Sequence, residues 1–342
     1  MDQYAVIMLE KARLAQSSWR DGQAIDASAE MHQIAISVAV ESFFGRDMRV
    51  EPGVGKSVVE AMTWDFGLGL LPCTGVLRRL PFPANLRARR AWEAVDEVIF
   101  EVIRRARDPS QDRADLVSLL VSAEDSEGID RPFTDDEIRD EALILLMAGH
   151  ETSATAMTWC LYYLMRHPVV RDRLEQEVDR VAPDRPLAPA DYDRLPYARA
   201  VFNEALRLAP PIYFVGREAL EDCTVGGYLI RKGTIVQPCI RVVHWNEAHF
   251  SQPADFRPER WLAEPLEHPR HAYLPFGFGA RICIAWGFAT MEAVFVLATI
   301  AQRWRLEAVS REPARVDSKA VYACKGGLPA IPRRRSTTGA RR

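Results

Sequence analysis

One cysteine, preceded by two closely spaced glycines, has the clearest chemical capability in this chain. In the run Phe276-Gly277-Phe278-Gly279-Ala280-Arg281-Ile282-Cys283, the glycines allow the backbone to turn sharply and to approach a flat ligand. We expect the last long helix to run from Cys283 to about Trp304, which would place the sulfur among unpaired N–H groups that stabilise a thiolate. A thiolate is the form of cysteine that binds iron, and Arg281 could pair with a carboxylate of the ligand.

The same run could also be a structural turn or a nucleotide-binding loop. In the first case, Cys283 is only a small buried hydrophobic residue after a glycine-rich turn. A dinucleotide-binding loop fits less well, because Ile282 stands where the third glycine of G-x-G-x-x-G belongs and no clear strand precedes the run.

A carboxylic acid and an alcohol lie side by side in Ala148-Gly149-His150-Glu151-Thr152-Ser153, in the middle of a predicted long helix. Ala148 and Thr152 share a face, Gly149 leaves room there, and the local hydrogen bonds can loosen around a ligand or a water. A Glu–Thr pair can pass protons, which oxygen activation at iron requires. The alternative is a plain helix with a solvated Glu151 and a space-filling Thr152. A zinc-protease motif is excluded, because Ala154 stands where the second histidine belongs.

Three charged residues could form a structural cluster. Glu204 and Arg207 are three apart on a predicted helix with apolar neighbours, and the loop-like run Phe256–Trp261 could add Arg260. Buried charges are tolerated only when all are paired. The alternative is a surface pair that adds little stability. Arg217 follows this helix and precedes the strands.

Together, and in this order along the chain, these groups resemble the motifs of the cytochromes P450. The Phe276–Cys283 run resembles the family's cysteine loop, with Ala285 where the family usually has glycine. The Ala148–Ser153 run matches A-G-x-E-T-[ST], Glu204 and Arg207 match E-x-x-R, and residues 258–260 match the P-E-R segment. The resemblance extends from about Tyr4 to Pro332.

The resemblance implies a haem-thiolate monooxygenase. Cys283 would be the axial ligand of the iron in haem b, iron protoporphyrin IX, and would push electron density towards the O–O bond. Thr152 and Glu151 would belong to the proton relay that drives cleavage of that bond. Arg281 and Arg217 would be partners of the haem propionates. The full set of implied haem contacts is Arg281, Arg217, Phe276, Gly277, Gly279, Ala148 and Gly149. The implied structural cluster is Glu204, Arg207 and Arg260.

Substrate and electron donor are also implied. Ile212, Tyr213 and Phe214, just after E-x-x-R, would form part of the pocket for an apolar small molecule that receives one oxygen atom from O₂. No flavin or iron–sulfur motif occurs in the sequence, so electrons from NAD(P)H would come through a ferredoxin- or flavodoxin-type partner. The run Tyr273–Phe276 resembles bacterial members related to fatty-acid and terpene hydroxylases.

Hydrophobic periodicity predicts a mainly α fold with a small β portion. Thr134 and Glu137 form a capping box at the start of the long helix, and the apolar run Ala142–Ala148 within it predicts burial on all sides. We expect short strands within Glu218–Arg241, one domain over residues 1–332 and a frayed basic tail at 333–342. The other predicted helices are Tyr4–Trp19, Ala27–Phe44, Arg87–Arg107, Pro168–Val181 and Tyr197–Leu208.

No counterpart of the family's N-terminal strands, its W-x-x-x-R helix or the loop over the substrate precedes Tyr4. We therefore expect a cytochrome P450 fold lacking its N-terminal strands and first helices. The alternative function is a truncated, catalytically inactive haem-binding or partner-binding protein.

Composition narrows the remaining possibilities. The net charge of -3 gives no case for nucleic acid as a general partner, and no apolar stretch is long enough for a membrane span. The six cysteines form no C-x-x-C pair and fit a reducing compartment, so we expect a cytoplasmic protein of the soluble bacterial type. The run Pro52–Ser57 resembles a phosphate-binding loop, but Val50 stands where its first glycine belongs.

Overall fold

The structure is a computed structural model, and it describes residues 2–45, 64, 74–77, 79–108, 115–122, 131–266, 268–318 and 321–335. The chain forms two compact units, residues 1–35 with 149–342, and residues 36–148. The expectation of one domain over residues 1–332 stays a prediction. The run Pro52–Ser57 lies outside the described residues.

Helices make up most of the described residues of both units, as the periodicity predicted. The first unit contains α1 (Asp2–Ala15), α8 (Pro168–Val181), α9 (Pro196–Leu208), α10 (Ile240–His244) and α11 (Trp286–Arg303), and the second contains α4 (Thr74–Leu77), α5 (Pro83–Ala106) and α6 (Leu116–Ser122). Two helices, α2 (Ala27–Phe44) and α7 (Asp135–Arg166), contribute residues to both units. Short 3-10 helices are η1 (Gln16–Ser18), η2 (Pro189–Arg194), η3 (Pro258–Trp261), η4 (Arg270–Ala272) and η5 (Gly279–Arg281).

Local sequence signals set the starts of several helices. The Thr134 N–H donates to Glu137 Oε2 at 2.8 Å, and the Glu137 N–H donates to Thr134 Oγ1 at 3.3 Å, so the predicted capping box is confirmed. Helices α5, α8 and α9 each have proline in the first turn, where its missing N–H has no helical partner to lose.

The strands are short and form four small sheets. Strand β9 (Pro329–Arg334) lies between β1 (Ile25–Asp26) and β6 (Trp304–Ala308), and both pairings are antiparallel. The other antiparallel pairs are β2 (Arg217–Glu218) with β5 (Ile235–Val236), β3 (Cys223–Val225) with β4 (Tyr228–Ile230), and β7 (Val316–Asp317) with β8 (Ala323–Cys324). The small strands expected within Glu218–Arg241 are therefore present.

One carboxylate joins the β1–β9 pair to α2. Asp26 Oδ1 accepts hydrogen bonds from the backbone N–H of Ser28 at 3.0 Å and of Ala29 at 3.4 Å, and so caps α2. The same oxygen accepts the Leu328 N–H at 2.8 Å. Gly327 has φ of +86°, and a Cβ there would overlap the Asp26 carboxylate, so this position requires glycine.

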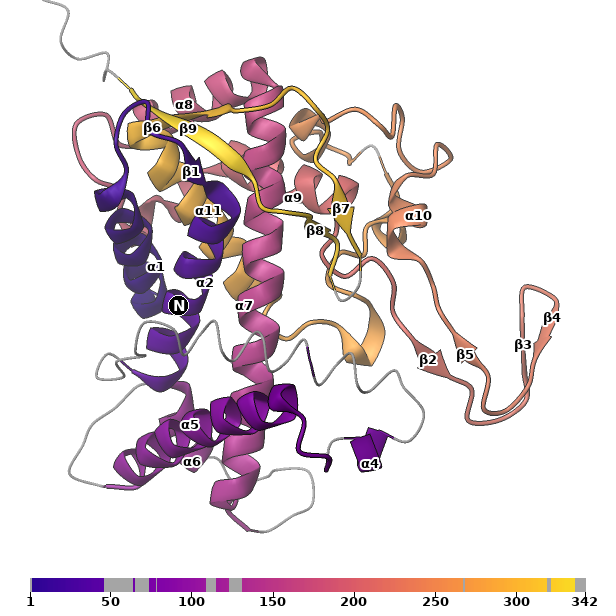
Figure 1. The fold of residues 1–342 in the computed structure, drawn as a ribbon. Helices are drawn as coiled ribbons and strands as arrows, with labels where there is room; N and C mark the ends of the chain where they lie inside the picture. Colours follow the sequence, from indigo (N-terminus) through magenta and orange to yellow (C-terminus); the bar gives the residue numbers. More distant parts are fainter. Residues whose placement is uncertain are drawn as a thin grey trace, which may run out of the picture. The chain divides into compact units, whose positions relative to one another are not determined.

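Helix α11 forms the centre of the first unit. Residues 290–301 of α11 are all buried, because α1, α8 and α9 pack against it (Figure 1). Burial around the whole circumference explains why the apolar residues of α11 show little amphipathic pattern. None of the described helices is both long and apolar enough to span a membrane.

Two local expectations were wrong. The run Ala142–Ala148 is not buried on all sides, since the side chain of Ile144 is 57% exposed and Ala148 is exposed. An apolar composition does not determine whether another element packs against each side of the helix. The residues of α7 that are buried all round are 153–161. The first residues of the expected tail are also not frayed: Arg333 and Arg334 end strand β9, and Arg335 forms ion pairs with Asp179 and Glu175.

Candidate active site

The loop that carries Cys283 is closed by backbone hydrogen bonds. The Cys283 N–H donates to Phe276 O at 2.8 Å, the Gly277 N–H to Leu274 O at 3.0 Å, and the Ile282 N–H to Gly279 O at 3.1 Å. Gly277 and Gly279 have φ of +77° and +68°, a conformation that favours glycine. These bonds fix the direction in which the loop presents Cys283.

The last helix does not begin at Cys283, as the sequence suggested, but at Trp286 after an N-cap at Ala285. Helical hydrogen bonding begins with the bond from the Ala289 N–H to Ala285 O at 2.9 Å, so the cysteine belongs to the loop that precedes the helix. Cys283 therefore lies two residues before the N-cap, close to the first unpaired N–H groups of α11 rather than among them.

Apolar residues next to Cys283 in the sequence are exposed, and two arginines lie on the loop that carries it or against that loop. Cys283 is an exposed free thiol, and Ile282, Ile284 and Trp286 are 52%, 88% and 56% exposed. The Arg217 guanidinium lies 5.7 Å from the ring centroid of Phe278, the aromatic residue between the two glycines. Arg281 is exposed on the same loop.

These residues fit a haem. Its iron accepts a soft thiolate, which the exposed Cys283 can supply. Its flat macrocycle could cover some of the large apolar side chains that are exposed next to Cys283 in the sequence. Its two propionates match the guanidinium groups of Arg217 and Arg281. Nothing lies within 4 Å of the position a Cβ would take on Gly279, so a ligand can approach the backbone there.

On α7, Glu151 is not simply solvated but forms an ion pair with His32 of α2. His32 Nε2 lies 3.3 Å from Glu151 Oε2, and the side chains of both residues are 30% exposed. The hydrogen bond from His32 lowers the pKa of Glu151, although burial acts in the opposite direction. Burial would lower the pKa of His32, but the bond to Glu151, its charge, the Ser28 carbonyl and Asp26 raise it overall.

The residues around Glu151 differ in burial. Gly149 and Thr152 are partly buried, Ala148 is exposed, and His150 and Ser153 are buried. Burial and the neighbouring charge of His32 lower the pKa of His150 to about 4, so this ring is neutral at pH 7. Its ring meets that of His32 edge to face, with centroids 5.5 Å apart.

Further along α11, Glu292 is a fully buried carboxyl group. Burial raises its pKa to about 8, and the side chain of Ser153 faces it from α7. Neither carboxyl oxygen makes a hydrogen bond of normal geometry with the described residues. A single glutamate in an apolar helix carries no motif, so this residue could not be recognised from the sequence.

The residues expected to line the substrate pocket lie between α9 and β2. Ile212 and Phe214 are 38% and 37% exposed, which is high for large apolar side chains. Tyr213 lies between them in sequence, with its ring against Phe214 at 4.9 Å and its hydroxyl donating to Ser318 O at 2.6 Å. The segment thus presents two apolar side chains and anchors the third residue.

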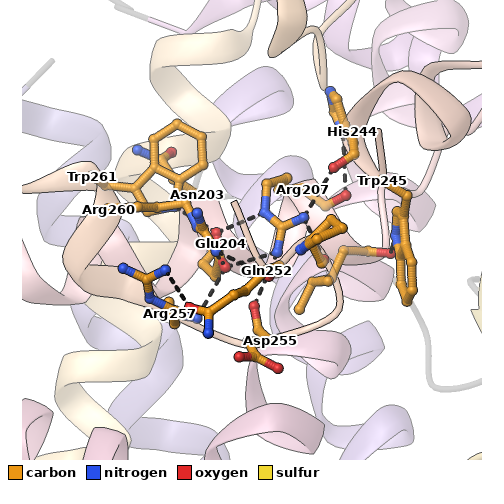
Figure 2. A network of polar contacts seen from close by, with 12 residues as sticks. Asn203, Glu204, Arg207, His244, Trp245, Gln252, Asp255, Arg257, Arg260 and Trp261 are labelled. Atoms are coloured by element: carbon orange, nitrogen blue, oxygen red, sulfur yellow. Dashed lines mark hydrogen bonds and ion pairs between the residues drawn. The ribbon is translucent and has the colours of Figure 1, made fainter. Parts of the chain in front are cut away.

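Glu204, Arg207 and Arg260 form one buried cluster, with side-chain exposures of 0%, 0% and 1% (Figure 2). Glu204 Oε1 accepts from Arg207 Nη2 at 2.9 Å and from Arg260 Nε at 3.0 Å, while Oε2 accepts from Arg207 Nε at 2.9 Å. The Trp261 indole and the Arg257 N–H also donate to this carboxylate, at 2.9 and 3.0 Å. One carboxylate thus bonds two guanidinium groups, and backbone carbonyls accept from their other N–H groups, so none of the three charged groups is buried without a partner.

This cluster is joined to the cysteine loop through His244, a residue that the sequence analysis missed. His244 Nδ1 lies 3.2 Å from Arg207 O, and Nε2 accepts the Leu274 N–H at 2.9 Å. Burial lowers the pKa of His244 to about 3, which keeps Nε2 free to accept. Tyr273 adds a second link, because its hydroxyl donates to Asn203 O at 3.1 Å. No local motif marks His244, since its partners are distant in sequence.

Comparison with known proteins identifies the family to which these features correspond. The family model described as cytochrome P450 matches residues 1–326. Among solved structures, the heme domain of cytochrome P450DA superposes with a TM-score of 0.88 at 28% identity, covering 98% of this chain and 74% of that one.

Several curated proteins are similar over most of this chain. Cyclooctat-9-en-7-ol 5-monooxygenase and cyclooctatin synthase of Streptomyces melanosporofaciens are 32% and 35% identical, each over 90% of this chain and 67% of their own length. Pentalenene oxygenase of Streptomyces avermitilis is 30% identical over 90% of this chain and 68% of its own length.

Proposed function

The chain belongs to the cytochrome P450 family and is a P450 monooxygenase, and from this premise we propose that it oxygenates an apolar terpenoid-like molecule at a haem b bound by Cys283. The observation that supports Cys283 most directly is its exposure on a closed glycine loop, between the exposed residues Ile282 and Ile284. Arg217 and Arg281 would hold the two propionates by charge-assisted hydrogen bonds.

When bound, the haem supplies the iron at which dioxygen is reduced and its O–O bond is cleaved. The chain's own residues supply ligand, orientation and protons. The Cys283 sulfur would bind the iron as a thiolate, and the Phe276 carbonyl holds the backbone of the cysteine in place. Glu151 and Thr152, adjacent on α7, would move protons through the carboxylate and the hydroxyl. Arg207 and His244 would keep the cysteine loop in position through Leu274.

The substrate proposal rests on the names of the relatives and on the pocket segment. Two relatives are named for oxygenating cyclooctat-9-en-7-ol and pentalenene. Ile212 and Phe214 offer apolar contact, as expected for a ligand with few polar groups. NAD(P)H would provide the electrons through a separate ferredoxin- or flavodoxin-type protein.

Haem ligation is tested by the absorption spectrum of the reduced, CO-bound protein. We expect the red-shifted Soret band of a thiolate ligand, and we expect Cys283→Ala to lose it, whereas Cys239→Ala retains it. A spectrum typical of histidine-ligated haem, or one that is unchanged in Cys283→Ala, would exclude the assignment. Absence of haem would favour the alternative of a partner-binding protein without turnover.

Substrate class is tested by ligand-induced spectral titration with pentalenene and, for comparison, lauric acid. We expect the terpene to bind more tightly, and Phe214→Ser to weaken its binding about tenfold, which corresponds to about 1.4 kcal/mol. Equal or tighter binding of the fatty acid would reject the terpenoid proposal. Turnover with NADPH is then compared between a ferredoxin and a flavodoxin, each with its reductase.

The relay is tested by the coupling of NADPH consumption to product. Thr152→Ala and Glu151→Gln should each lower the coupled fraction, because protons would arrive too slowly and reduced oxygen would escape as peroxide. Coupling that is unchanged in both variants would remove these two residues from the mechanism.

A further inference from the structure

His32 is held on α2 so that one particular ring nitrogen faces Glu151. His32 Nδ1 lies 2.8 Å from Ser28 O, and a carbonyl oxygen can only accept, so Nδ1 must carry a proton. The other nitrogen, Nε2, lies 3.3 Å from Glu151 Oε2. The nitrogen that gains or loses a proton when His32 titrates is therefore the one that contacts the carboxylate.

The surroundings favour the doubly protonated ring. In that form both ring nitrogens carry a proton, and they donate to Ser28 O and to Glu151 Oε2. The charged or titratable groups that act on His32 are Glu151, Asp26 and His150. The two carboxylates stabilise the cation, and the pKa of His150, lowered to about 4, leaves that ring uncharged above pH 6. The pKa of His32 is instead raised despite its burial, because Glu151 bonds and attracts the imidazolium, so His32 is the histidine of this group that carries the titrating charge.

The pair also reaches solvent. The side chains of His32 and Glu151 are each 30% exposed, whereas His150 and Ser153, the next residues on either side of the Glu151–Thr152 pair, are buried. Water can thus exchange protons with the imidazole, and the imidazole contacts the carboxylate.

We propose that His32 is the positioning residue that orients Glu151 and returns a proton to it after each delivery, so that the protonation state of His32 sets the pH range of efficient turnover. This inference rests on the proposed relay through Glu151 and Thr152.

The transfer is a balanced proton movement. The Nε2–H bond of the His32 imidazolium breaks and an O–H bond forms at Glu151 Oε2, which leaves a neutral ring that still donates through Nδ1 to Ser28 O. Solvent then protonates Nε2 again. Glu151 is a carboxylate before the step and a carboxylic acid after it, and it passes the proton on through Thr152.

The first test measures the histidine directly and does not depend on turnover. Labelled histidine in the reduced, CO-bound holoprotein, which is diamagnetic, is titrated by NMR. We expect the pKa of His32 to lie above 6.5, with the proton retained on Nδ1, and to fall in Glu151→Gln. His167 is the matched control, because its Nδ1 also bonds a carbonyl one turn earlier, Tyr163 O at 2.8 Å. A His32 titration that is the same in Glu151→Gln would overturn the inference.

The second test compares the pH dependence of coupling between pH 6 and 9. In the wild type, proton return should fall up to about tenfold per pH unit above the pKa of His32. His32→Gln should be poorly coupled and nearly independent of pH, and His32→Lys, a cation up to higher pH, should move the decline upward. His167→Gln should behave as the wild type.

The outcomes separate the two proposals. If Glu151→Gln and Thr152→Ala lower coupling but His32→Gln keeps the wild-type pH profile, the relay stands and the role of His32 is refuted. If Glu151→Gln and Thr152→Ala leave coupling unchanged, the relay itself is refuted, whatever the NMR titration shows.

Discussion

Replacing Glu292 by glutamine tests whether a buried, protonated carboxyl group makes the stability of the first unit depend on pH. The carboxyl is fully buried on α11, and burial raises its pKa from the ordinary 4.5 to about 8. Between these values the folded protein holds a proton that the unfolded chain releases. The unfolded state therefore gains stability relative to the folded state as the pH rises through this range.

The magnitude follows from the pKa difference. One pKa unit corresponds to about 1.36 kcal/mol, so the rise from 4.5 to about 8 sets an upper limit of roughly 5 kcal/mol. The stabilisation is fully present below pH 4.5 and is lost by about pH 8, with roughly 3–4 kcal/mol of the loss between pH 5 and 8. Water entering around the ionised group reduces this, so we expect about 2–4 kcal/mol.

The assay is urea unfolding of the haem-loaded protein, followed by far-UV circular dichroism at pH 5, 6.5 and 8. Glutamine has the shape of the protonated carboxyl and does not titrate, so Glu292→Gln should become more stable relative to the wild type as the pH rises. Taking the difference cancels the contributions of other titrating groups. Glu247→Gln, a change at an exposed loop position, serves as the matched control.

Two results would contradict the reasoning. A difference between Glu292→Gln and wild type that does not vary with pH would mean that the carboxyl titrates normally in the folded state. A difference of the opposite sign, in which the wild type gains stability with rising pH, would mean that the buried group is ionised and paired.

Three further changes have expected outcomes that thermal or urea unfolding can measure. Gly327→Ala should cost about 1–3 kcal/mol, because it forces a Cβ into a positive-φ position against Asp26; Gly226→Ala, also at positive φ but in open space, should cost less. Glu204→Gln should cost about 3–5 kcal/mol, since it leaves two buried guanidinium groups underpaired, and equal stability would argue against the cluster. His244→Phe should cost about 1–3 kcal/mol by leaving the Leu274 N–H without its acceptor, and should speed haem release; unchanged haem retention would show that the cysteine loop does not depend on this link.

Features with a local cause could be predicted from the sequence. The capping box of Thr134 and Glu137 marks the start of α7 within one residue, and the bounds of α2 and α8 agree with the expected Ala27–Phe44 and Pro168–Val181. Such signals act within one or two helical turns, so neighbouring residues are enough to determine them.

Features that depend on distant partners could not be predicted. The contacts of Glu151 with His32, of Arg207 with His244 and of Glu292 with Ser153 join separate helices, and no spacing in the sequence indicates them. The start of α11 was misplaced because Cys283 and Ile284 are apolar like the first residues of the helix, and apolar periodicity does not separate the end of a loop from the start of a helix.

The carboxylate of Asp26 gives the C-terminal strand an influence on a helix near the start of the chain. It holds the first amides of α2 while it also holds the turn that enters β9, and His32 follows less than two turns along that helix. Exchange of residues 326–335 for those of a relative should therefore alter the titration of an imidazole some 300 positions earlier, unless the incoming segment preserves the amide that Asp26 binds. The pKa of His32 then depends on both the start of α2 and the turn before β9, and transfer of either segment alone to another protein will not reproduce it.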